Sequence, residues 1–345
     1  MKNLKIKYLL GFFILASIFL NTLSSCSNDD DKGSSGPIIN SVSPSVEGDL
    51  VPVTIGKPKN VYVIQGSGFN TLEKIYFNDF ETYFNPTLVT DNAIFVTIDE
   101  DTPFSNVANE LKIVTKSGTV IHPFIIAPPD PTLLNYSPIN PLEGEVITIK
   151  GNYFLEPIVK IGDVPATIIS STLTEIKVKV PAGANNKYVS VTNISGTATS
   201  KEAIGTALFD DAWSNDWFYD GGDDKVTDVS SPGVLQGELM VKSVNDGWSG
   251  TQFRNKDWAT IDVANYKGIR ISIKGAKVGK VALILNGHWS DPEARVIDVT
   301  TEWKEYNLPW TDWPFEITGL QTLVLKDFTG EKSTYYLDNI GFILK

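Results

Sequence analysis

The chain has 345 residues, of which 42% are hydrophobic and 20% charged, a balance typical of globular domains rather than disordered chains. Acidic residues (41) outnumber basic residues (29), and the formal net charge of −12 argues against nucleic acid and anionic lipid as partners, because both require clustered Lys and Arg. The single cysteine excludes an internal disulfide, and the length allows about two to three domains.

The first 25 residues have the order of a secretory signal. The apolar run 9–20 follows three basic residues, Lys2, Lys5 and Lys7, and it is short for a membrane span of ~20 residues. The next segment, LSSC, ends at Cys26 and resembles a bacterial lipobox, which implies that Cys26 is lipidated and becomes the first mature residue. The alternative is an ordinary signal peptide with an unmodified cysteine.

The segment 26–36 is polar and rich in Asp, Gly and Ser, which predicts a flexible tether. Its acidic triplet, Asp29–Asp31, follows the cysteine and resembles the export signal of surface lipoproteins of the Bacteroidetes. The resemblance implies an outer-membrane lipoprotein that faces the cell exterior. The alternative is a solvated linker on a periplasm-facing anchor.

Residues 37–205 contain a diverged internal repeat of short β-branched stretches between turn residues. The first copy reads SVSP (41–44), QGSGF (65–69) and FND (77–79), and the second reads YSP (136–138), GNYF (151–154) and IGD (161–163). This series resembles the IPT/TIG immunoglobulin-like family, which implies two antiparallel sandwiches, at 37–128 and 129–205, that act as spacers.

Three local features of the repeat lead to further predictions. Gly66, Gly68 and Gly151 are expected at tight turns that require positive φ. The extra segment 47–59 of the first copy predicts an added hairpin. The segment PPDP (128–131) predicts a stiff joint between the copies, because proline fixes φ and favours extended backbone.

The region 206–345 holds all eight tryptophans of the chain, at a density that a core does not need, because aliphatic side chains fill space without a buried N–H. Strands are expected at Gly237–Val244, Gly250–Arg254, Gly268–Lys274, Lys280–Leu285, Arg295–Val299, Lys304–Leu308, Leu320–Lys326 and Thr334–Phe342. About eight strands in ~140 residues predict a jelly-roll β-sandwich, so the whole chain is expected to be all-β.

Several segments of this region resemble carbohydrate-binding modules of the jelly-roll fold: FDD (209–211), WSGTQF (248–253), GIRISIKG (268–275), WKEY (303–306) and YLDNIGF (336–342). Together with the lipobox, the tether and the IPT/TIG copies, they resemble the surface glycan-binding proteins of Bacteroidetes polysaccharide-utilisation systems, especially the group that binds xyloglucan or related β-glucans. The resemblance implies non-catalytic capture of a neutral β-glucan, beside an outer-membrane importer and a second glycan-binding protein.

Tryptophan suits such a ligand, because an indole can cover the apolar C–H face of a pyranose while polar side chains reach its hydroxyls. The predicted ring platforms lie at strand ends and in the loop 309–314: Trp248, Trp289, Trp310 and Trp313, with Trp217 as a weaker candidate. For each of these residues a packing role is the alternative. Strand alternation predicts the polar ligand contacts Gln252, Arg254, Asn286 and His288. Trp258 and Trp303 are assigned to packing, and Trp213 is left open.

Asp210, Asp211 and Asp338 lie near the two ends of this region, where turn and capping chemistry is expected and a structural calcium ion is the alternative. The sequence has no Gly-x-Ser-x-Gly or His-Glu-x-x-His motif and two histidines in all, so we expect no enzyme and no cofactor. Two alternatives remain open: a glycosidase that uses paired carboxylates, and an adhesin that binds protein partners.

Overall fold

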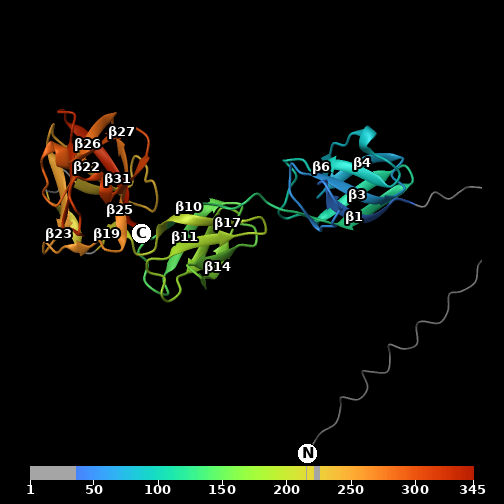
Figure 1. The fold of residues 1–345 in the computed structure, drawn as a ribbon, viewed down its shortest axis with the longest axis horizontal. Helices are drawn as coiled ribbons and strands as arrows, with labels where there is room; N and C mark the ends of the chain where they lie inside the picture. The colour runs from blue at the N-terminus through green and yellow to red at the C-terminus, as the bar shows by residue number, and fades with distance from the viewer. Residues whose placement is uncertain (1–35, 215, 221–225) are drawn as a thin grey trace, which may run out of the picture.

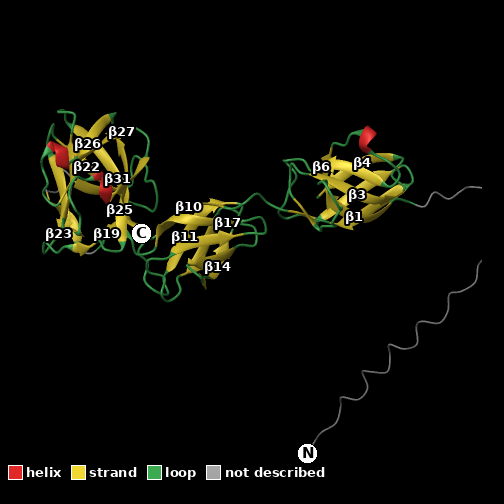
Figure 2. Cartoon of the chain, in the orientation of Figure 1, coloured by secondary structure: helices red, strands yellow, loops and turns green. Residues whose placement is uncertain are grey.

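The structure is a computed structural model that describes residues 36–345, apart from 215 and 221–225. The described chain is built from β-strands, with three short 3-10 turns, η1 (Pro86–Leu88), η2 (Asp291–Glu293) and η3 (Trp310–Asp312) (Figure 2). The strands form three sandwiches in series, here called the N-terminal, middle and C-terminal sandwiches (Figure 1). The all-β fold class is therefore confirmed.

The predictions for the signal, for Cys26 and for the acidic triplet lie outside the described residues. Within the described ranges, no helix is both long enough and apolar enough to cross a bilayer.

The N-terminal sandwich pairs a three-stranded sheet with a four-stranded sheet. Their strand orders are β1 (Ile38–Pro44), β3 (Val61–Ser67), β6 (Ala93–Thr97) and β5 (Phe80–Thr82), β4 (Leu72–Phe77), β7 (Glu110–Thr115), β8 (Gly118–Pro123). The predicted extra hairpin at 47–59 is wrong. Instead β2 (Ile55–Gly56) pairs in parallel with β9 (Ile125–Ile126), so the extra segment closes the sandwich against its last strand.

The middle sandwich pairs two four-stranded sheets. Their orders are β10 (Thr132–Ser137), β11 (Val146–Asn152), β15 (Glu175–Lys179), β14 (Thr167–Ser171) and β13 (Val164–Pro165), β12 (Ile158–Ile161), β16 (Tyr188–Thr192), β17 (Thr197–Ala203). Both sandwiches carry a bulge near the start of the first strand, between Ile39 and Ser41 in one and between Leu133 and Asn135 in the other.

The glycines Gly66 and Gly151 lie opposite these bulges, and the prediction that both have positive φ is wrong. Gly68 does have positive φ (79°), as expected. Gly66 and Gly151 lie inside β3 and β11 without positive φ, and a Cβ on them would meet the carbonyl oxygens of Ile38 and Thr132 at 1.8 and 1.9 Å. Glycine is required there because the neighbouring strand passes too close for any side chain.

The C-terminal sandwich faces a seven-stranded sheet with a five-stranded sheet. Five strands of the larger sheet follow the order β19 (Ala212–Trp213), β18 (Ala207–Asp210), β31 (Ser333–Leu344), β22 (Met240–Asn245), β21 (Val226–Val229). The other two branch from β31: β25 (Tyr266–Gly275) pairs with β31, and β28 (Lys304–Pro309) pairs with β25. The smaller sheet runs β20 (Trp217–Asp220), β23 (Gly250–Asn255), β30 (Thr322–Asp327), β26 (Gly279–Leu285), β27 (Arg295–Val299). A short pair, β24 (Ile261–Asp262) and β29 (Gly319–Leu320), lies beside them.

All eight strands predicted for this region are present, within a few residues at each end. The strands β18 to β21 were not predicted, because each is only two to four residues long and the segment 207–229 shows little alternation of apolar and polar residues. Each sandwich has its own core cluster, and the C-terminal core includes Phe209, Phe253 and Leu325.

Hydrogen bonds from two asparagine side chains, Asn140 and Asn339, join the middle and C-terminal sandwiches. Asn140 exchanges two hydrogen bonds with the backbone of Ala207, at 2.8 and 3.0 Å. The side chain of Asn339 donates to Glu202 (2.9 Å) and accepts from the buried guanidinium of Arg270 (2.8 Å). This joint therefore holds the last sandwich in a defined orientation relative to the middle sandwich.

The joint between the first two sandwiches uses the prolines that the sequence singled out. Asn193 donates to the carbonyl of Pro129 (3.0 Å), and Ser195 donates to the carbonyl of Pro128. Phe104 and Tyr153 meet edge to face across this joint, with ring centroids 6.2 Å apart. The fixed proline φ angles and these contacts together favour a stiff connection.

Candidate functional site

The outer face of the five-stranded sheet is the face turned away from the C-terminal core. On β23, Thr251 and Phe253 are buried, whereas Gln252 and Arg254 alternate with them and point the other way. On β26, Leu283 and Leu285 belong to the core, as the alternation predicted. The register then places Gln252 beside Val324 and Val324 beside Ile284, so polar β23 side chains flank a short apolar middle on this face.

Two of the predicted ring platforms are wrong. Trp217 and Trp313 are 3% and 4% exposed and belong to the core between the two sheets. Their indole N–H groups have no hydrogen-bond partner among the described residues, so packing alone holds them. The premise that a core avoids tryptophan because of its N–H therefore fails here.

Three further tryptophans pack within the protein: Trp310, for which packing was the alternative, Trp213, which was left open, and Trp303, which was assigned to packing. Trp310 is half-buried against the core, and its Nε1 donates to the carbonyl of Tyr266 (2.9 Å). Trp213 stacks on Phe253, with centroids 4.9 Å apart. Trp303 donates from Nε1 to the carbonyl of Gly233 (3.2 Å), in agreement with its assignment to structure.

The exposed tryptophans are Trp248 (56%), Trp289 (52%) and Trp258 (49%). The first two were predicted to be exposed, and their exposure is confirmed. The assignment of Trp258 to packing is wrong, because the turn after β23 carries its ring outward instead of back toward the core.

Trp258 and Trp289 lie at the same end of the five-stranded sheet. The register pairs Arg254 with Thr322 and Leu285 with Leu323, so the last residues of β23 and β26 flank the first residues of β30. Trp258 follows β23 by three residues and Trp289 follows β26 by four. Two strand spacings amount to about 10 Å, so these rings leave the sheet from neighbouring positions.

The ring of Trp258 is held by Arg254. The Arg254 guanidinium carbon lies 4.2 Å from the Trp258 ring centroid and 4.6 Å from that of Phe218. Its Nε donates to Asp220 (2.9 Å) and its Nη1 donates to the carbonyls of Asn255 and Lys256. Through its cation–π contact, Arg254 positions the ring of Trp258, while a direct contact of Arg254 with a ligand stays a prediction.

The loops that carry the two rings are joined through Gln321, which the sequence analysis missed. Its side-chain N–H donates to the carbonyl of Trp258 (2.7 Å), and its backbone N–H donates to Oδ1 of Asn286 (2.8 Å). Asn286 also accepts from the N–H of Thr322 and donates to the carbonyl of Gly319. Asn286 is therefore a scaffold residue, and no local pattern pointed to Gln321, which is 63 residues from Trp258.

His288 precedes Trp289 and is fixed on two sides. Its ring stacks on Phe315, with centroids 3.7 Å apart and planes 11° apart, and Nδ1 lies 2.8 Å from Oε1 of Glu293. Hydrogen bonds from Ser290 and His288 lower the pKa of Glu293. The half-buried His288 ring therefore presents a defined edge beside Trp289.

The aspartates at the chain ends serve turns and the joint. Asp210 accepts from the N–H of Ile139 and from Gln236, and Asp211 accepts from two backbone N–H groups at 2.6 and 2.7 Å. Asp338 accepts from the backbone N–H groups of residues 235, 236 and 339. Burial raises the pKa of Asp338 to about 7. This is the turn chemistry that was expected, and the described residues include no cluster of three or more His, Cys, Asp or Glu side chains suited to a metal ion.

Comparisons with known proteins agree with this architecture. Residues 131–204 match the family described as IPT/TIG domain, which confirms the expectation for the second copy. An IPT/TIG domain-containing protein of Bacteroides ovatus is 27% identical over 156 residues, or 43% of this chain. That match spans 31% of the relative's own length.

Two solved structures resemble the whole described chain. The surface glycan-binding protein PbSGBP-B from Prevotella bryantii matches with a TM-score of 0.51 at 15% identity, covering 90% of this chain and 99% of that one. SGBP-B from a complex xyloglucan utilization locus in Bacteroides uniformis matches with a TM-score of 0.37 at 12% identity, covering 90% and 100%. The likeness to the Prevotella protein shows that this chain has the same serial β-sandwich fold.

Proposed function

We propose that the C-terminal sandwich captures a neutral polysaccharide, a β-glucan of the xyloglucan or mixed-linkage type, without cleaving it. The observation that carries this proposal is the pair of exposed rings, Trp258 and Trp289, held at one end of the five-stranded sheet on either side of β30. Exposed indoles that are fixed in position offer flat apolar platforms for the C–H faces of successive sugars.

The magnitudes favour weak, reversible binding. If one sugar removes ~100 Å² of indole from water, the gross gain is about 2.5 kcal/mol at ~25 cal/mol/Å². Two such contacts, less the free energy of immobilising the glycan, leave an affinity between about 1 μM and 1 mM. An affinity in that range suits a protein that holds a polymer and then releases it.

The charges beside the rings support a neutral ligand. Arg254 is paired with Asp220 (2.9 Å), Lys256 with Asp216 (3.1 Å), and Arg295 with Asp312 (3.4 Å). Paired charges leave no excess positive potential with which to attract a polyanion.

The other two sandwiches act as spacers in this proposal. The Cys26 lipid would anchor the chain to the outer membrane, and the tether and sandwiches would carry the binding site away from the surface toward the cell exterior. An outer-membrane importer and a second glycan-binding protein would receive and share the captured chain. The test of this part is metabolic labelling of Cys26 with a lipid precursor, together with proteolytic shaving of whole cells.

Affinity electrophoresis of the purified protein on a panel of neutral β-glucans tests the binding. We expect xyloglucan or mixed-linkage glucan to retard the protein, and retardation by none of the panel would overturn the proposal and favour the adhesin. Incubation with the retained glycan should release no reducing ends. Their release would instead assign the protein to the hydrolases.

A further inference from the structure

The third exposed tryptophan, Trp248, lies at the opposite end of β23 from the Trp258–Trp289 pair. The register pairs Gly250 with Lys326 at that end, and Arg254 with Thr322 at the other. The six residues of β23 span about 17 Å, so one sugar unit cannot contact both ends. Any role of Trp248 in binding is therefore separate from that of the pair.

The backbone of Trp248 is in an unfavourable conformation. Its φ is +63°, in the left-handed region, which is sterically unfavourable for a bulky side chain. A buried ring would offset that strain by packing, but Trp248 remains 56% exposed. Backbone strain of this kind clusters at ligand-binding sites, which makes Trp248 a candidate contact residue.

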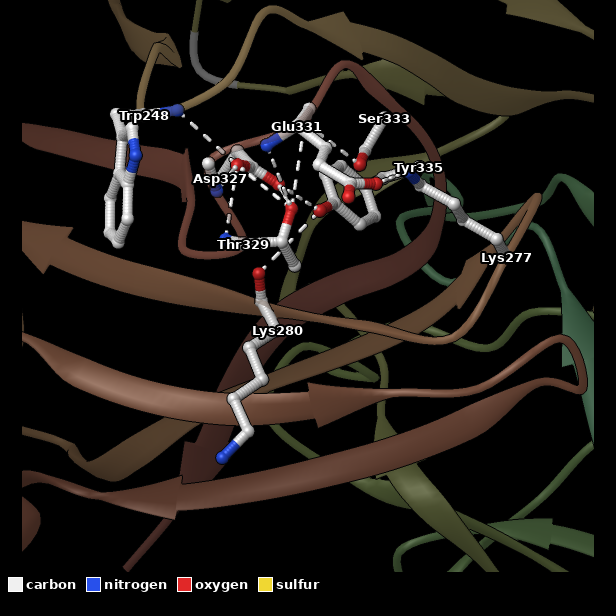
Figure 3. A network of polar contacts seen from close by, with 9 residues as sticks. Trp248, Lys277, Lys280, Asp327, Thr329, Glu331, Ser333 and Tyr335 are labelled. Carbon is white, nitrogen blue, oxygen red and sulfur yellow. Dashed lines mark hydrogen bonds and ion pairs between the residues drawn. The ribbon is translucent and has the colours of Figure 1, made fainter.

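The surrounding loops are built to hold this conformation (Figure 3). Asp327 is fully buried, and it accepts hydrogen bonds from the N–H groups of Trp248 (3.3 Å), Thr329 (3.1 Å) and Gly330 (3.0 Å). The hydroxyls of Thr329 and Tyr335 also donate to it. Burial raises the pKa of Asp327, but these hydrogen bonds outweigh burial and the net effect lowers it. An ionised carboxylate therefore ties the loop of Trp248 to the turn after β30.

The ring itself is located by its neighbours. Phe328 meets the indole edge to face, with centroids 5.4 Å apart and planes at 74°. A Cβ on Gly330 would come within 2.6 Å of Nε1 of Trp248, and a Cβ on Gly247 would come within 2.2 Å of the carbonyl oxygen of Gly330. Both glycines are thus required for the ring to lie against this turn while more than half of it faces solvent.

The charges around Trp248 are paired. Nζ of Lys277 lies 2.6 Å from Oε2 of Glu331, and Nζ of Lys332 lies 3.7 Å from Oδ1 of Asp246. The surface around the ring therefore offers an apolar plane within a balanced polar rim, which suits an uncharged sugar better than an ionic ligand.

We infer that Trp248 is a second sugar-contact point on the C-terminal sandwich, which engages a distant pyranose of the same neutral glycan chain that the Trp258–Trp289 pair holds. This inference rests on the proposed function. Two linked weak contacts raise the affinity for a long chain by a local-concentration effect, and that gain is absent for a ligand too short to reach both.

The test compares a long polymer with a trisaccharide, which is shorter than the separation of the two points. Trp248→Asn removes the ring and tolerates the left-handed backbone. We expect it to weaken binding of soluble mixed-linkage glucan or xyloglucan three- to tenfold by calorimetry, and to leave the trisaccharide Kd within twofold by NMR titration. Trp258→Ala should weaken both. Trp248→Phe, which keeps an aromatic ring, should retain most of the polymer affinity that Trp248→Asn loses, and it should not alter the melting temperature.

The control variant is Tyr83→Ser in the N-terminal sandwich, where Tyr83 is 81% exposed, and it should change neither affinity. Unchanged polymer affinity in Trp248→Asn would overturn the inference. Equal losses for polymer and trisaccharide would also overturn it, by making Trp248 part of one continuous site. If the unaltered protein binds no glycan, the proposed function itself fails, and that result is distinct from either outcome.

Discussion

Two groups of tryptophans in the C-terminal sandwich differ in what holds them. Trp217 and Trp313 lie between the sheets, where they are almost fully buried and their N–H groups lack partners among the described residues. Trp258 and Trp289 lie beyond strand ends, and their loops are fixed by hydrogen bonds through Gln321 and Asn286. The same side chain therefore serves packing where a sheet covers it, and display where a polar scaffold supports its loop.

The largest expected effect comes from truncating a ring of the buried group. Trp313→Ala should lower the free energy of unfolding by about 3–5 kcal/mol, because it leaves a large cavity in the core. Trp313→Phe should lose less than about 1.5 kcal/mol, since it keeps most of the volume and removes an unpaired N–H. Urea denaturation measures both, and equal losses would mean that Trp313 is not held by packing.

Truncating a ring of the exposed group should reverse that pattern. Trp258→Ala and Trp289→Ala should each weaken binding of the retained β-glucan about tenfold or more, equivalent to ~1.4 kcal/mol, and should leave cooperative unfolding intact. Affinity electrophoresis and thermal melting on the same samples separate the two readouts. Full affinity in both variants would remove the pair from the site.

A finer distinction within the exposed group comes from backbone conformation. Trp258 has a φ of +59°, whereas the φ of Trp289 is not positive. Trp258→Gly should therefore be more stable than Trp258→Ala by about 1 kcal/mol, because glycine tolerates the left-handed region. At Trp289 the order should be reversed, with alanine more stable by about 0.5 kcal/mol. Thermal melts of the four variants check the sign at each site.

A pH-dependent effect concerns Asp338, a buried residue of β31 beside Asn339 of the joint between the middle and C-terminal sandwiches. Burial raises the pKa of Asp338 to about 7, against ~3.9 in an unfolded chain, so between these values the folded protein retains a proton that the unfolded chain loses. This contribution to stability is complete below about pH 4 and is lost as pH rises through about 7. The melting temperature should thus fall between pH 5.5 and pH 8, and Asp338→Asn should flatten that fall. A melting temperature that instead rises between pH 5.5 and pH 8 would contradict this prediction. An Asp338→Asn variant whose melting temperature depends on pH as in the unaltered protein would contradict it as well.

Much of the fold followed from local pattern. Alternation at period two correctly separated Thr251 and Phe253 from Gln252 and Arg254, because successive side chains of a strand point to opposite faces. The repeated motifs correctly indicated two similar sandwiches, although they did not reveal why Gly66 and Gly151 are required. That reason is a carbonyl oxygen on a neighbouring strand, whose approach no local pattern encodes.

The residues of the candidate site were harder to predict from the sequence than the fold. The density of tryptophans pointed to the C-terminal sandwich, which carries the three exposed tryptophan rings, and glycines beside Trp248 and Trp289 pointed to two of them. Trp313 and Trp258 were assigned the wrong way round, because each lies in an irregular segment where alternation does not apply. Their environments depend on which distant residues cover or support them.

The order of the residues by itself determined that this chain is all-β, that its domains follow one another, and which side chains of β23 enter the core, since these properties depend on neighbours a few residues apart. Only the tertiary structure decided which tryptophan rings face solvent. A loop takes its direction from contacts such as Gln321 with Trp258 and Asp327 with Trp248, and these form only when strands far apart in sequence pair in one sheet.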